Sequence, residues 1–306
     1  MYDIIIIGGG PAGLTAGLYA ARARAKTLLI ESYSIMGQAT MTELIENYPG
    51  VDKINGFEFV TRLKKQAEAF GLKIIQGTVA GLRRDEALPH LYIIEAEGQT
   101  YEAVSIIVAT GASPKKLQVP GENEFLGKGV SYCATCDGAF FRDKQIVVVG
   151  GGDTAVEEAL FLTRFGKGVT IVHRRECLRA IKLLQERAFS NKKINFIWDS
   201  VVEEIKGKSK VEKVCLKNVK TAEKTEISCE GVFVFTGWTP NTDFLKQKVE
   251  LDEKGNVMVD NALSTSQPGV FAAGDCSAKI LRQVVTACGD GALAAFSASQ
   301  YVETIL

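Results

Sequence analysis

Two stretches of the chain consist largely of consecutive apolar residues that lead directly into a run of glycines. Tyr2–Ile7 precedes Gly8-Gly9-Gly10-Pro11-Ala12-Gly13, and Gln145–Val149 precedes Gly150-Gly151-Gly152-Asp153-Thr154-Ala155. A short apolar run is typical of a strand that is buried on both faces of a parallel sheet. An Ala- and Leu-rich helix pattern follows each glycine run, to about Ala23 in the first case. The pattern therefore predicts two strand–turn–helix units, each with G-x-G-x-x-G or G-x-G-x-x-A at its turn.

A second element recurs in both halves of the chain. Ile106–Ala109 leads into Thr110-Gly111-Ala112-Ser113-Pro114, and Val232–Phe235 leads into Thr236-Gly237-Trp238-Thr239-Pro240. Each is an apolar strand that ends in T-G-x-[ST]-P, where glycine frees the backbone and proline is expected to stop the strand. The repeat predicts two related nucleotide-binding domains.

Residues 244–306 follow the second repeat and contain a strand signal at Gly269–Asp275 and an Ala-rich helix pattern at Gly291–Ile305. They are too few to form a third core, so we expect them to return to the first domain. The predicted fold class is α/β, with two Rossmann-like, three-layer dinucleotide-binding domains, the second inserted into the first. The expected domains are 1–114 with 244–306, and 115–243, and the two crossings between them make a natural hinge.

Composition changes this picture little. The 306 residues are 46% hydrophobic and 24% charged, and Lys+Arg equals Asp+Glu at 36 each, so no overall field draws the protein to nucleic acid or an anionic membrane. Apolar runs such as Ile4–Ile7 are far shorter than the roughly 20 residues that span a bilayer. The N-terminus carries Asp3 instead of a basic region, so we expect no secretory signal and a cytoplasmic location.

The first glycine turn has the features of a dinucleotide site. Gly8 permits the tight turn, Gly10 allows a pyrophosphate to approach the backbone, and Gly13 allows the helix to pack on the strand. The positive end of the helix dipole then faces the phosphates, beside Pro11 and Ala12. Glu31 follows the next predicted strand, Thr27–Ile30, where a carboxylate can accept the ribose hydroxyls of an adenosine.

The second turn, with candidate ligands Gly150, Gly152, Asp153 and Thr154, differs at the corresponding place. After the strand Val169–Val172 the chain has cationic residues where the ribose-binding acid would stand: His173, Arg174, Arg175 and Arg179. Such a cluster suits a 2′-phosphate, so the second nucleotide is predicted to be NADPH in preference to NADH. The alternative is a solvated, basic start of a helix.

Two dinucleotide sites imply electron transfer between two carriers. One is a nicotinamide, and FAD is expected at the other because a flavin accepts a hydride and passes two electrons to sulfur. Cys133-Ala134-Thr135-Cys136 is the candidate acceptor, with the Asp137 carboxyl beside it to exchange protons. The alternative is two buried cysteines that happen to lie close together. The chain has no second pair at this spacing and only two histidines, so no zinc site or other metal site is expected. The other five cysteines are interpreted as buried or incidental thiols: Cys177, Cys215, Cys229, Cys276 and Cys288.

These motifs, in this order, resemble the bacterial, low-molecular-weight thioredoxin reductases, which depend on FAD and NADPH. The resemblance covers essentially the whole chain. The matching motifs are G-G-G-P-A-G at 8–13, E-N-Y-P-G at 46–50, A-T-G at 109–111, C-A-T-C-D-G at 133–138, G-G-G-D-T-A at 150–155, H-R-R-x-x-x-R at 173–179, A-G-D at 273–275 and R-Q at 282–283. The position of the cysteine pair just before the second glycine turn separates this family from glutathione reductase and its relatives.

The resemblance implies a role for each matching residue. Cys136 would lie against the flavin, Cys133 would attack the disulfide of thioredoxin or a thioredoxin-like protein, and Asp137 would be the acid and base. Phe140 and Phe141 would be candidates for the apolar surface that thioredoxin meets, and the FAD domain would form a homodimer. The implied FAD contacts are Gly37, Gln38, Asn47, Thr110, Gly111, Asp275, Arg282 and Gln283, and Thr154 with the basic cluster would bind NADPH.

The order of the motifs creates a geometric conflict. The cysteine pair and the nicotinamide site share the inserted domain, yet both must meet one flavin. We therefore expect the domain to rotate about the linkers near Gly111–Lys116 and Thr236–Asp243, as the resemblance also implies. The alternatives are a reductase of another small redox protein, a ferredoxin-linked enzyme, which lacks the NADPH motifs, and a non-catalytic nucleotide sensor.

Overall fold

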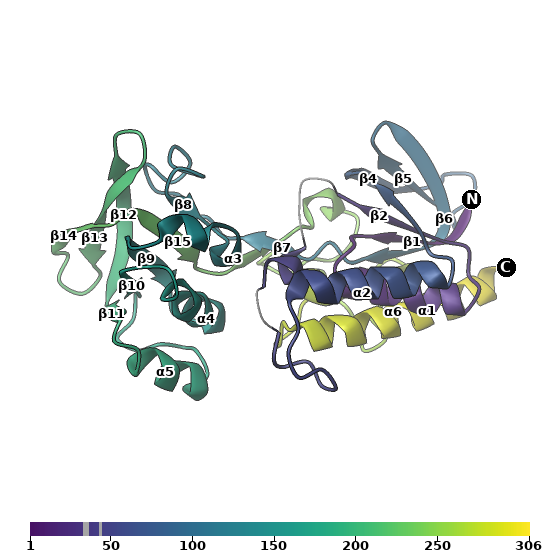
Figure 1. Cartoon of the computed structure of the whole chain (residues 1–306). Helices are drawn as coiled ribbons and strands as arrows, with labels where there is room; N and C mark the ends of the chain where they lie inside the picture. The colour runs from purple at the N-terminus through teal and green to yellow at the C-terminus, as the bar shows by residue number, and fades with distance from the viewer. Residues whose placement is uncertain (33–36, 43–44) are drawn as a thin grey trace. The chain divides into compact units, whose positions relative to one another are not determined.

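The computed structural model describes residues 1–32, 37–42 and 45–306, which fold into two compact units (Figure 1). Unit 1 comprises Met1–Ser113 and Thr239–Leu306, and unit 2 comprises Pro114–Trp238. Among the helices of the described residues, none is long and apolar enough to cross a membrane.

Unit 1 is built on a seven-stranded sheet with the order β3-β2-β1-β6-β5-β4, in which β17 also pairs with β6. The strands β1, β2, β3, β6 and β17 run parallel, and β4 and β5 form an antiparallel edge. The strands are β1 (Tyr2–Ile7), β2 (Thr27–Glu31), β3 (Lys73–Gln76), β4 (Val79–Arg84), β5 (Tyr92–Ala96), β6 (Gln99–Val108) and β17 (Val270–Ala272).

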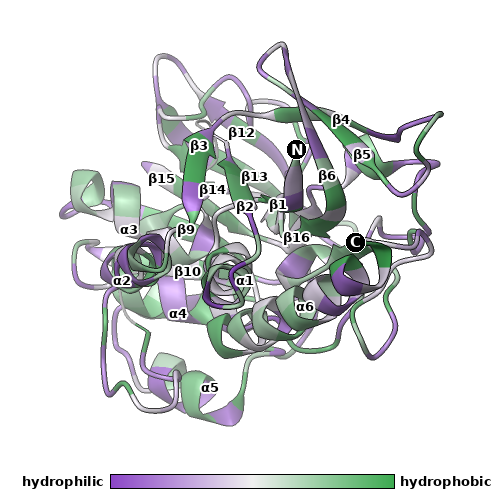
Figure 2. Cartoon of the chain, turned by 90° about the vertical axis from the view of Figure 1, so that its right-hand side faces the viewer, coloured by the Kyte–Doolittle hydropathy of each residue, from purple (hydrophilic) through white to green (hydrophobic). Residues whose placement is uncertain are grey.

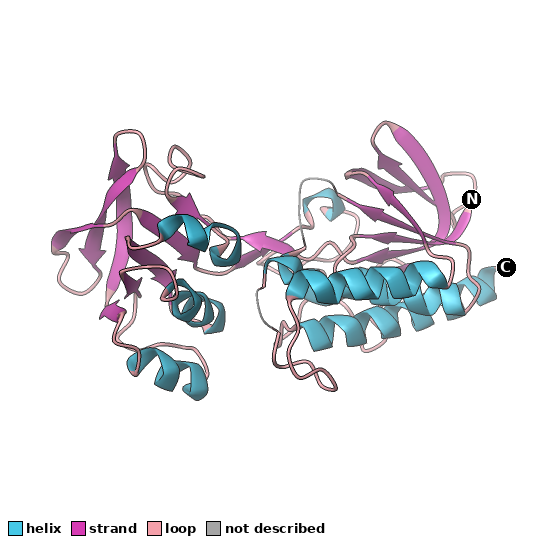
Figure 3. Ribbon diagram, viewed as in Figure 1, coloured by secondary structure: helices cyan, strands magenta, loops and turns pink. Residues whose placement is uncertain are grey.

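The central strands of unit 1 are buried on both faces, as their continuous apolar runs predict. Ile4 and Ile6 pack with three helices: α1 (Pro11–Arg22), α2 (Gly56–Ala69) and α6 (Val284–Ile305). Ile5 and Ile7 point to the opposite face, where they pack with β4, β5 and the chain near Leu245. Figure 3 shows the helices together on one side of this sheet. Short 3₁₀ turns complete the unit: η1 (Gln38–Met41), η3 (Asp243–Leu245) and η4 (Gly274–Cys276).

The helix α6 is longer than its Ala-rich segment predicts, because it begins at Val284 instead of Gly291. Its first turns contain β-branched residues and Gly289, which have weak helix propensity and conceal the start. A capping box makes the helix begin there: the Gln283 side chain accepts from the backbone N–H of Thr286, and the Thr286 hydroxyl accepts from that of Gln283.

Unit 2 contains a five-stranded parallel sheet with the order β11-β10-β9-β15-β8 and a separate antiparallel sheet of β12, β13 and β14. The strands are β8 (Val130–Ser131), β9 (Gln145–Gly150), β10 (Gly168–Val172), β11 (Ile194–Ile197), β12 (Ser200–Gly207), β13 (Val211–Asn218), β14 (Lys224–Ser228) and β15 (Gly231–Phe235). The helical segments are α3 (Ala134–Asp137), η2 (Gly138–Phe141), α4 (Asp153–Leu162) and α5 (Lys182–Phe189).

The two units share one topology. When the parallel strands are counted from β1 in unit 1 and from β9 in unit 2, the spatial order is third, second, first and fourth in both, β3-β2-β1-β6 and β11-β10-β9-β15. This order matches the first four positions of the doubly wound sheet of dinucleotide-binding folds. The predicted fold class, two Rossmann-like α/β domains, is therefore confirmed.

The two T-G-x-[ST]-P segments end β6 and β15, but they do not stop strand formation altogether. After Gly111 (φ 63°) and Gly237 (φ 134°) the chain forms two further short strands, β7 (Ala112–Pro114) and β16 (Trp238–Pro240), which pair with each other. Proline is tolerated because the residue after it makes the ladder bond: the N–H of Lys115 donates to Gly237 O at 2.9 Å, and the N–H of Asn241 donates to Gly111 O at 3.0 Å.

The packing of α6 on α1 depends on a glycine. A Cβ at Gly291 would lie 2.1 Å from the carbonyl oxygen of Ala12, whereas a Cβ at Gly289, in the same helix, would meet no heavy atom within 4 Å. Figure 2 shows that α6 carries both hydrophobic and hydrophilic residues along its length, as a helix with one packed face should.

We therefore predict opposite effects for two Gly-to-Ala substitutions in α6. Gly291→Ala should force α6 away from α1 and lower the free energy of unfolding by about 1–3 kcal/mol. Gly289→Ala should leave it unchanged or raise it by up to about 1 kcal/mol, because alanine is the better helix former. Chemical denaturation followed by circular dichroism measures both, and equal destabilisation by the two would contradict this account of the packing.

Candidate functional site

In the first glycine turn, two glycines are in close contact with backbone atoms, and the third, at the start of α1, faces open space. A Cβ at Gly8 would lie 2.3 Å from the carbonyl oxygen of Ala109, and one at Gly13 would lie 1.9 Å from that of Gly8. At Gly10, the N-cap of α1, a Cβ would meet nothing within 4 Å, and no side chain caps the helix. The free N–H groups of the first turn and the space above Gly10 fit a pyrophosphate.

Glu31 stands where a ribose-binding acid is needed. It is the last residue of β2, and its carboxyl carbon lies only 2.5 Å from the place that a Cβ on Gly9 would take. Burial raises the pKa of this carboxyl, and Lys64 opposes the rise. A half-buried carboxyl beside the glycine turn is suited to accept ribose hydroxyls, so this edge of unit 1 fits an adenine dinucleotide.

Several other predicted FAD contacts in unit 1 are brought together in pairs. Asn47 Nδ2 donates to Gln283 Oε1 at 3.0 Å, although 236 residues separate them in the chain. A Cβ on Gly37 would lie 3.7 Å from the Cα of Gly10, so this residue adjoins the phosphate turn. Gln38 Nε2 donates to the carbonyl oxygen of Ala112 at 2.5 Å.

Thr110 and Gly111 are held by Asn241, which the sequence analysis did not identify. The Thr110 hydroxyl donates to the carbonyl oxygen of Asn241 at 2.8 Å, and the Asn241 side-chain amide donates to that of Thr110 at 3.0 Å. The backbone N–H of Asn241 donates to Gly111 O at 3.0 Å. The signal was present in the repeat, because Asn241 directly follows the second T-G-x-[ST]-P segment.

Asp275 lies in the turn η4, which a half-buried ion pair stabilises. Burial raises the pKa of Asp275, while Lys279 and Arg282 lower it. Gly274, with φ 78°, donates its N–H to Asp290 Oδ2 at 2.9 Å, and Asp290 is paired with Lys279. Lys279 and Asp290 carry no motif that could have identified them. The Arg282 guanidinium donates to Asn256 Oδ1 at 3.0 Å.

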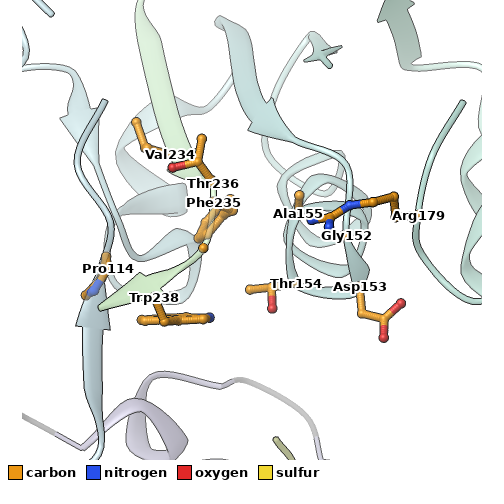
Figure 4. A pocket seen from close by; sticks show the side chains of 11 residues that line it. Pro114, Gly152, Asp153, Thr154, Ala155, Arg179, Val234, Phe235, Thr236 and Trp238 are labelled. Atoms are coloured by element: carbon orange, nitrogen blue, oxygen red, sulfur yellow. The ribbon is translucent and has the colours of Figure 1, made fainter. Parts of the chain in front are cut away.

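The second glycine turn borders a pocket of about 170 Å³ within unit 2. Figure 4 shows Phe235, Thr236 and Trp238 on one side of it, and Gly152, Thr154 and Arg179 on the other. Gly152 is the N-cap of α4 and, as at α1, no side chain caps the helix. The pocket therefore joins free N–H groups, an aromatic ring and a cation, which fits a phosphorylated nucleotide.

Arg179 reaches this pocket because backbone hydrogen bonds hold its loop against the glycine turn. Its N–H donates to Gly151 O at 2.7 Å, and Asp153 Oδ1 accepts from the N–H of Ile181 at 2.8 Å. Asp153 thus braces the loop that carries Arg179. Arg174 and Arg175 are exposed and follow the end of β10.

His173 does not belong to the exposed cations with which it was grouped. It is only 5% exposed, its ring lies 2.5 Å from the place of a Cβ on Gly151, and Nε2 has no hydrogen-bond partner among the described residues. Burial lowers its pKa, and the charges of Arg179, Arg174 and Arg175 lower it further. The imidazole is therefore neutral and supports the glycine turn, so the positive charge at this site comes from the three arginines.

Cys133 and Cys136 form a disulfide across the start of α3, with their Cα atoms 5.4 Å apart. Cys133 is the N-cap residue, and its Sγ accepts from the N–H of Cys136 at 3.1 Å. Cys136 is exposed, and Cys133 and Asp137 are half-buried. This bond and the helix terminus both favour a thiolate on Cys133 after reduction. The arrangement excludes the interpretation as two buried cysteines.

The disulfide and the nucleotide pocket lie at the same edge of the unit 2 sheet. The strands β8, β9, β10 and β15 are parallel, so the residues that follow them share the carboxyl edge. Cys133 comes two residues after β8, Gly151 follows β9, and Thr236 follows β15. In open α/β sheets this is the edge at which ligands bind.

The two phenylalanines and the five other cysteines singled out in the sequence differ in their exposure to solvent. Phe140, four residues after Cys136, is 73% exposed, whereas Phe141 is 7% exposed and packs edge-on against Phe233. Cys177 is an exposed free thiol, and four other free thiols are buried: Cys215, Cys229, Cys276 and Cys288. Within residues 1–32, 37–42 and 45–306, no group of three or more His, Cys, Asp or Glu side chains could hold a metal ion.

Comparisons with known proteins agree with this chemistry. The model of the family described as pyridine nucleotide-disulphide oxidoreductase matches residues 2–291. A thioredoxin reductase from Peptoclostridium acidaminophilum is 48% identical over 310 residues, which cover 99% of this chain and 98% of the relative. Thioredoxin reductase of Lactococcus lactis in its FR conformation is 48% identical, with a TM-score of 0.96 over 99% of this chain and 100% of its own. A Streptococcus pyogenes thioredoxin reductase, also 48% identical with 99% of both chains covered, has a TM-score of 0.66.

The burial of His173 predicts its titration. Because its folded pKa lies below the ordinary value of 6.5, the unfolded chain binds more protons as the pH falls below 6.5. The stability that the neutral imidazole provides is therefore present above pH 6.5 and is lost as the pH falls towards the folded pKa. Proton NMR should show the His173 ring titrating below pH 6.5, with the signal assigned in a His90→Gln variant. A midpoint at or above 6.5 would contradict the buried, neutral assignment.

Proposed function

The chain belongs to the pyridine nucleotide-disulphide oxidoreductase family, among the thioredoxin reductases, and we propose that it passes electrons from NADPH through FAD to its Cys133–Cys136 disulfide and then to thioredoxin. The observation that carries the proposal is the position of this disulfide on the sheet edge that also bears the nucleotide pocket of unit 2.

The two glycine turns suit different nucleotides. Unit 1, with Glu31 at the end of β2, would hold FAD through the open start of α1 and the predicted contacts around Asn47, Asp275 and Gln283. Unit 2 has arginines in place of the acid, and would hold NADPH at the start of α4 with Arg179 on the pocket wall. A guanidinium binds a 2′-phosphate where a carboxylate would repel it.

When bound, FAD supplies a two-electron carrier that takes a hydride from NADPH and reduces a disulfide. After reduction, the Cys133 thiolate is stabilised by the N–H of Cys136 and attacks one sulfur of the thioredoxin disulfide, which releases the other sulfur as a thiolate. Cys136 then attacks Cys133 in the mixed disulfide, restores the Cys133–Cys136 bond and releases the second thiolate. Asp137 exchanges the protons that this interchange requires.

The partner surface would lie beside the disulfide. Phe140, four residues after Cys136 in the chain, is exposed, and an exposed aromatic side chain in this segment is suited to dock an apolar surface around the partner's disulfide. The assembly proposed from the family resemblance is a homodimer through unit 1, and the proposed location is the cytoplasm, where reduced thiols persist.

A rotation of unit 2 between half-reactions resolves the conflict between the disulfide and the nicotinamide, which share one sheet edge but need the same flavin. Gly111 and Gly237, both at positive φ beside the crossing strands β7 and β16, are suited to absorb such a change. Two solved relatives of equal identity to this chain differ in TM-score, 0.96 against 0.66, as expected if thioredoxin reductases adopt more than one arrangement of the same two units.

The alternatives lack support in the site. A ferredoxin-linked enzyme needs no NADPH site, yet Arg179 is braced at the pocket by Asp153 and Gly151. A nucleotide sensor does not need an exposed disulfide with a carboxyl beside it. A reductase of another small redox protein would use the same chemistry, so partner assays separate it.

The function is tested by Cys136→Ser. Under anaerobic conditions the wild-type protein should be bleached by NADPH, and the reduced enzyme should be reoxidised by oxidised thioredoxin. The variant should still be bleached by NADPH but should lose at least about a thousandfold of its thioredoxin reduction, since it cannot form the internal disulfide. Retention of thioredoxin reduction, or a wild-type protein that binds no flavin, would overturn the proposal.

Nucleotide preference is tested by Arg179→Ala. Loss of a charge-assisted bond to phosphate should raise the KM for NADPH by about tenfold to a hundredfold and leave the KM for NADH nearly unchanged. The matched control is Lys192→Ala, which removes an exposed cation before β11, at the opposite edge of the sheet. Steady-state kinetics with both nucleotides provides the measurement, and equal effects on the two would exclude a contact with the 2′-phosphate.

A further inference from the structure

A carboxylate is buried in unit 2 outside the nucleotide pocket and the disulfide. Glu122 is 1% exposed and accepts three hydrogen bonds, each of 2.7 Å: from the N–H of Leu117, the N–H of Gln118 and the hydroxyl of Tyr132. A buried charge is tolerated only when it is fully hydrogen-bonded, so these three donors have to be held in place together.

The donors come from two functionally distinct segments. Leu117 and Gln118 follow the crossing strand β7, which enters unit 2. Tyr132 lies between β8 and Cys133, the sulfur proposed to attack thioredoxin. The Glu122 carboxylate therefore ties the incoming chain to the residue directly before the reactive cysteine.

Hydrogen bonds from Ser131 also fix the backbone of Cys133. The Ser131 hydroxyl accepts from the N–H of Cys133 at 3.0 Å and donates to its carbonyl oxygen at 3.2 Å. Ser131 is itself held by the pairing of β8 with β15. Tyr132, between these two residues, is anchored by its side chain to Glu122. The turn into α3 is therefore held by two restraints, the pairing of β8 with β15 and the hydrogen bond of the Tyr132 side chain.

The phenol can serve only as a donor to this carboxylate. Burial raises the pKa of Tyr132, and the hydrogen bond and charge of Glu122 raise it further, so the hydroxyl stays protonated in the working pH range. The bond is charge-assisted and is stronger than one between neutral groups.

We propose that Glu122 and Tyr132 are positioning residues for Cys133, which hold its sulfur in the geometry for disulfide exchange; the inference rests on the proposed function. Exchange needs three sulfur atoms nearly in line, and small displacements of a reacting group cost large factors in rate. The same tether keeps the Cys136 N–H directed at the Cys133 sulfur, which favours its thiolate.

Tyr132→Phe tests the tether, because it removes only the hydroxyl. We expect kcat with thioredoxin to fall about threefold to tenfold with little change in KM for thioredoxin, and flavin reduction by NADPH in stopped-flow measurements to stay unchanged. In a Cys136→Ser background, the pH profile of Cys133 alkylation by iodoacetamide, followed by mass spectrometry, should shift to higher pH.

Tyr92→Phe is the matched control. Its buried phenol, in unit 1, also donates to an oxygen, the carbonyl of Pro268. This variant should lose stability without altering the kinetics or the alkylation profile. Glu122→Gln should slow thioredoxin reduction in the same way, because its NH2 group would face at least one of the three donors, and the effects of the two substitutions should be less than additive, since both disturb one cluster of hydrogen bonds.

Three outcomes would overturn the inference. The first is that Tyr132→Phe has the same alkylation profile and kcat as the wild type. The second is that Tyr132→Phe slows flavin reduction by NADPH as much as it slows thioredoxin reduction. The third is that Tyr92→Phe has the same effects as Tyr132→Phe. The alkylation profile needs no thioredoxin, so it decides on the positioning role even if the wild-type protein failed to reduce thioredoxin, a result that would overturn only the proposed function.

Discussion

Both units depend on one close contact, in which the first turn of a helix packs on the end of the strand before it. The carbonyl oxygen of Gly8 occupies the place that a side chain at position 13 would need, and a Cβ on Gly150 would lie 2.7 Å from the Cβ of Ala155 in the first turn of α4. The N-cap residues, Gly10 and Gly152, have no side chain, so the starts of α1 and α4 stand uncapped at the edge of their sheets. The phosphate sites, and the acid or cations beside them, follow from this contact.

The two sheets carry different chemistry at the strand that pairs with the fourth strand. In unit 1 this strand is β17, which comes from the end of the chain, and in unit 2 it is β8, which comes before β9. Both pair in parallel with the fourth strand, β6 or β15, and both end at the carboxyl edge. One leads to Asp275 and the other to Cys133, so equivalent places in the two sheets serve a proposed cofactor contact and a disulfide.

Buried and half-buried polar groups around these sites hold the neighbouring backbone in place. Asp290 holds the turn at Gly274, Glu122 holds Tyr132, and the neutral ring of His173 supports Gly151. Asp290 and Glu122 each have a partner ten or more residues away in the chain, and the His173 ring packs against another loop. Their role depends on burial, because burial excludes water as a competing partner and makes an unpaired donor or acceptor costly in free energy.

The sequence by itself determined the two glycine turns, their strands and helices, the acid at Glu31, the cations after β10 and the cysteine pair. These features are local, because the backbone geometry of a tight turn and the period of buried strands are specified by neighbouring residues. Only the tertiary structure decided that His173 is buried and neutral, that Asn241 holds Thr110, that α6 begins seven residues earlier than its alanines indicate, and that Glu122 joins the incoming chain to the redox turn. Burial and hydrogen bonds between distant segments arise only when the chain has folded, and no spacing along the sequence records them.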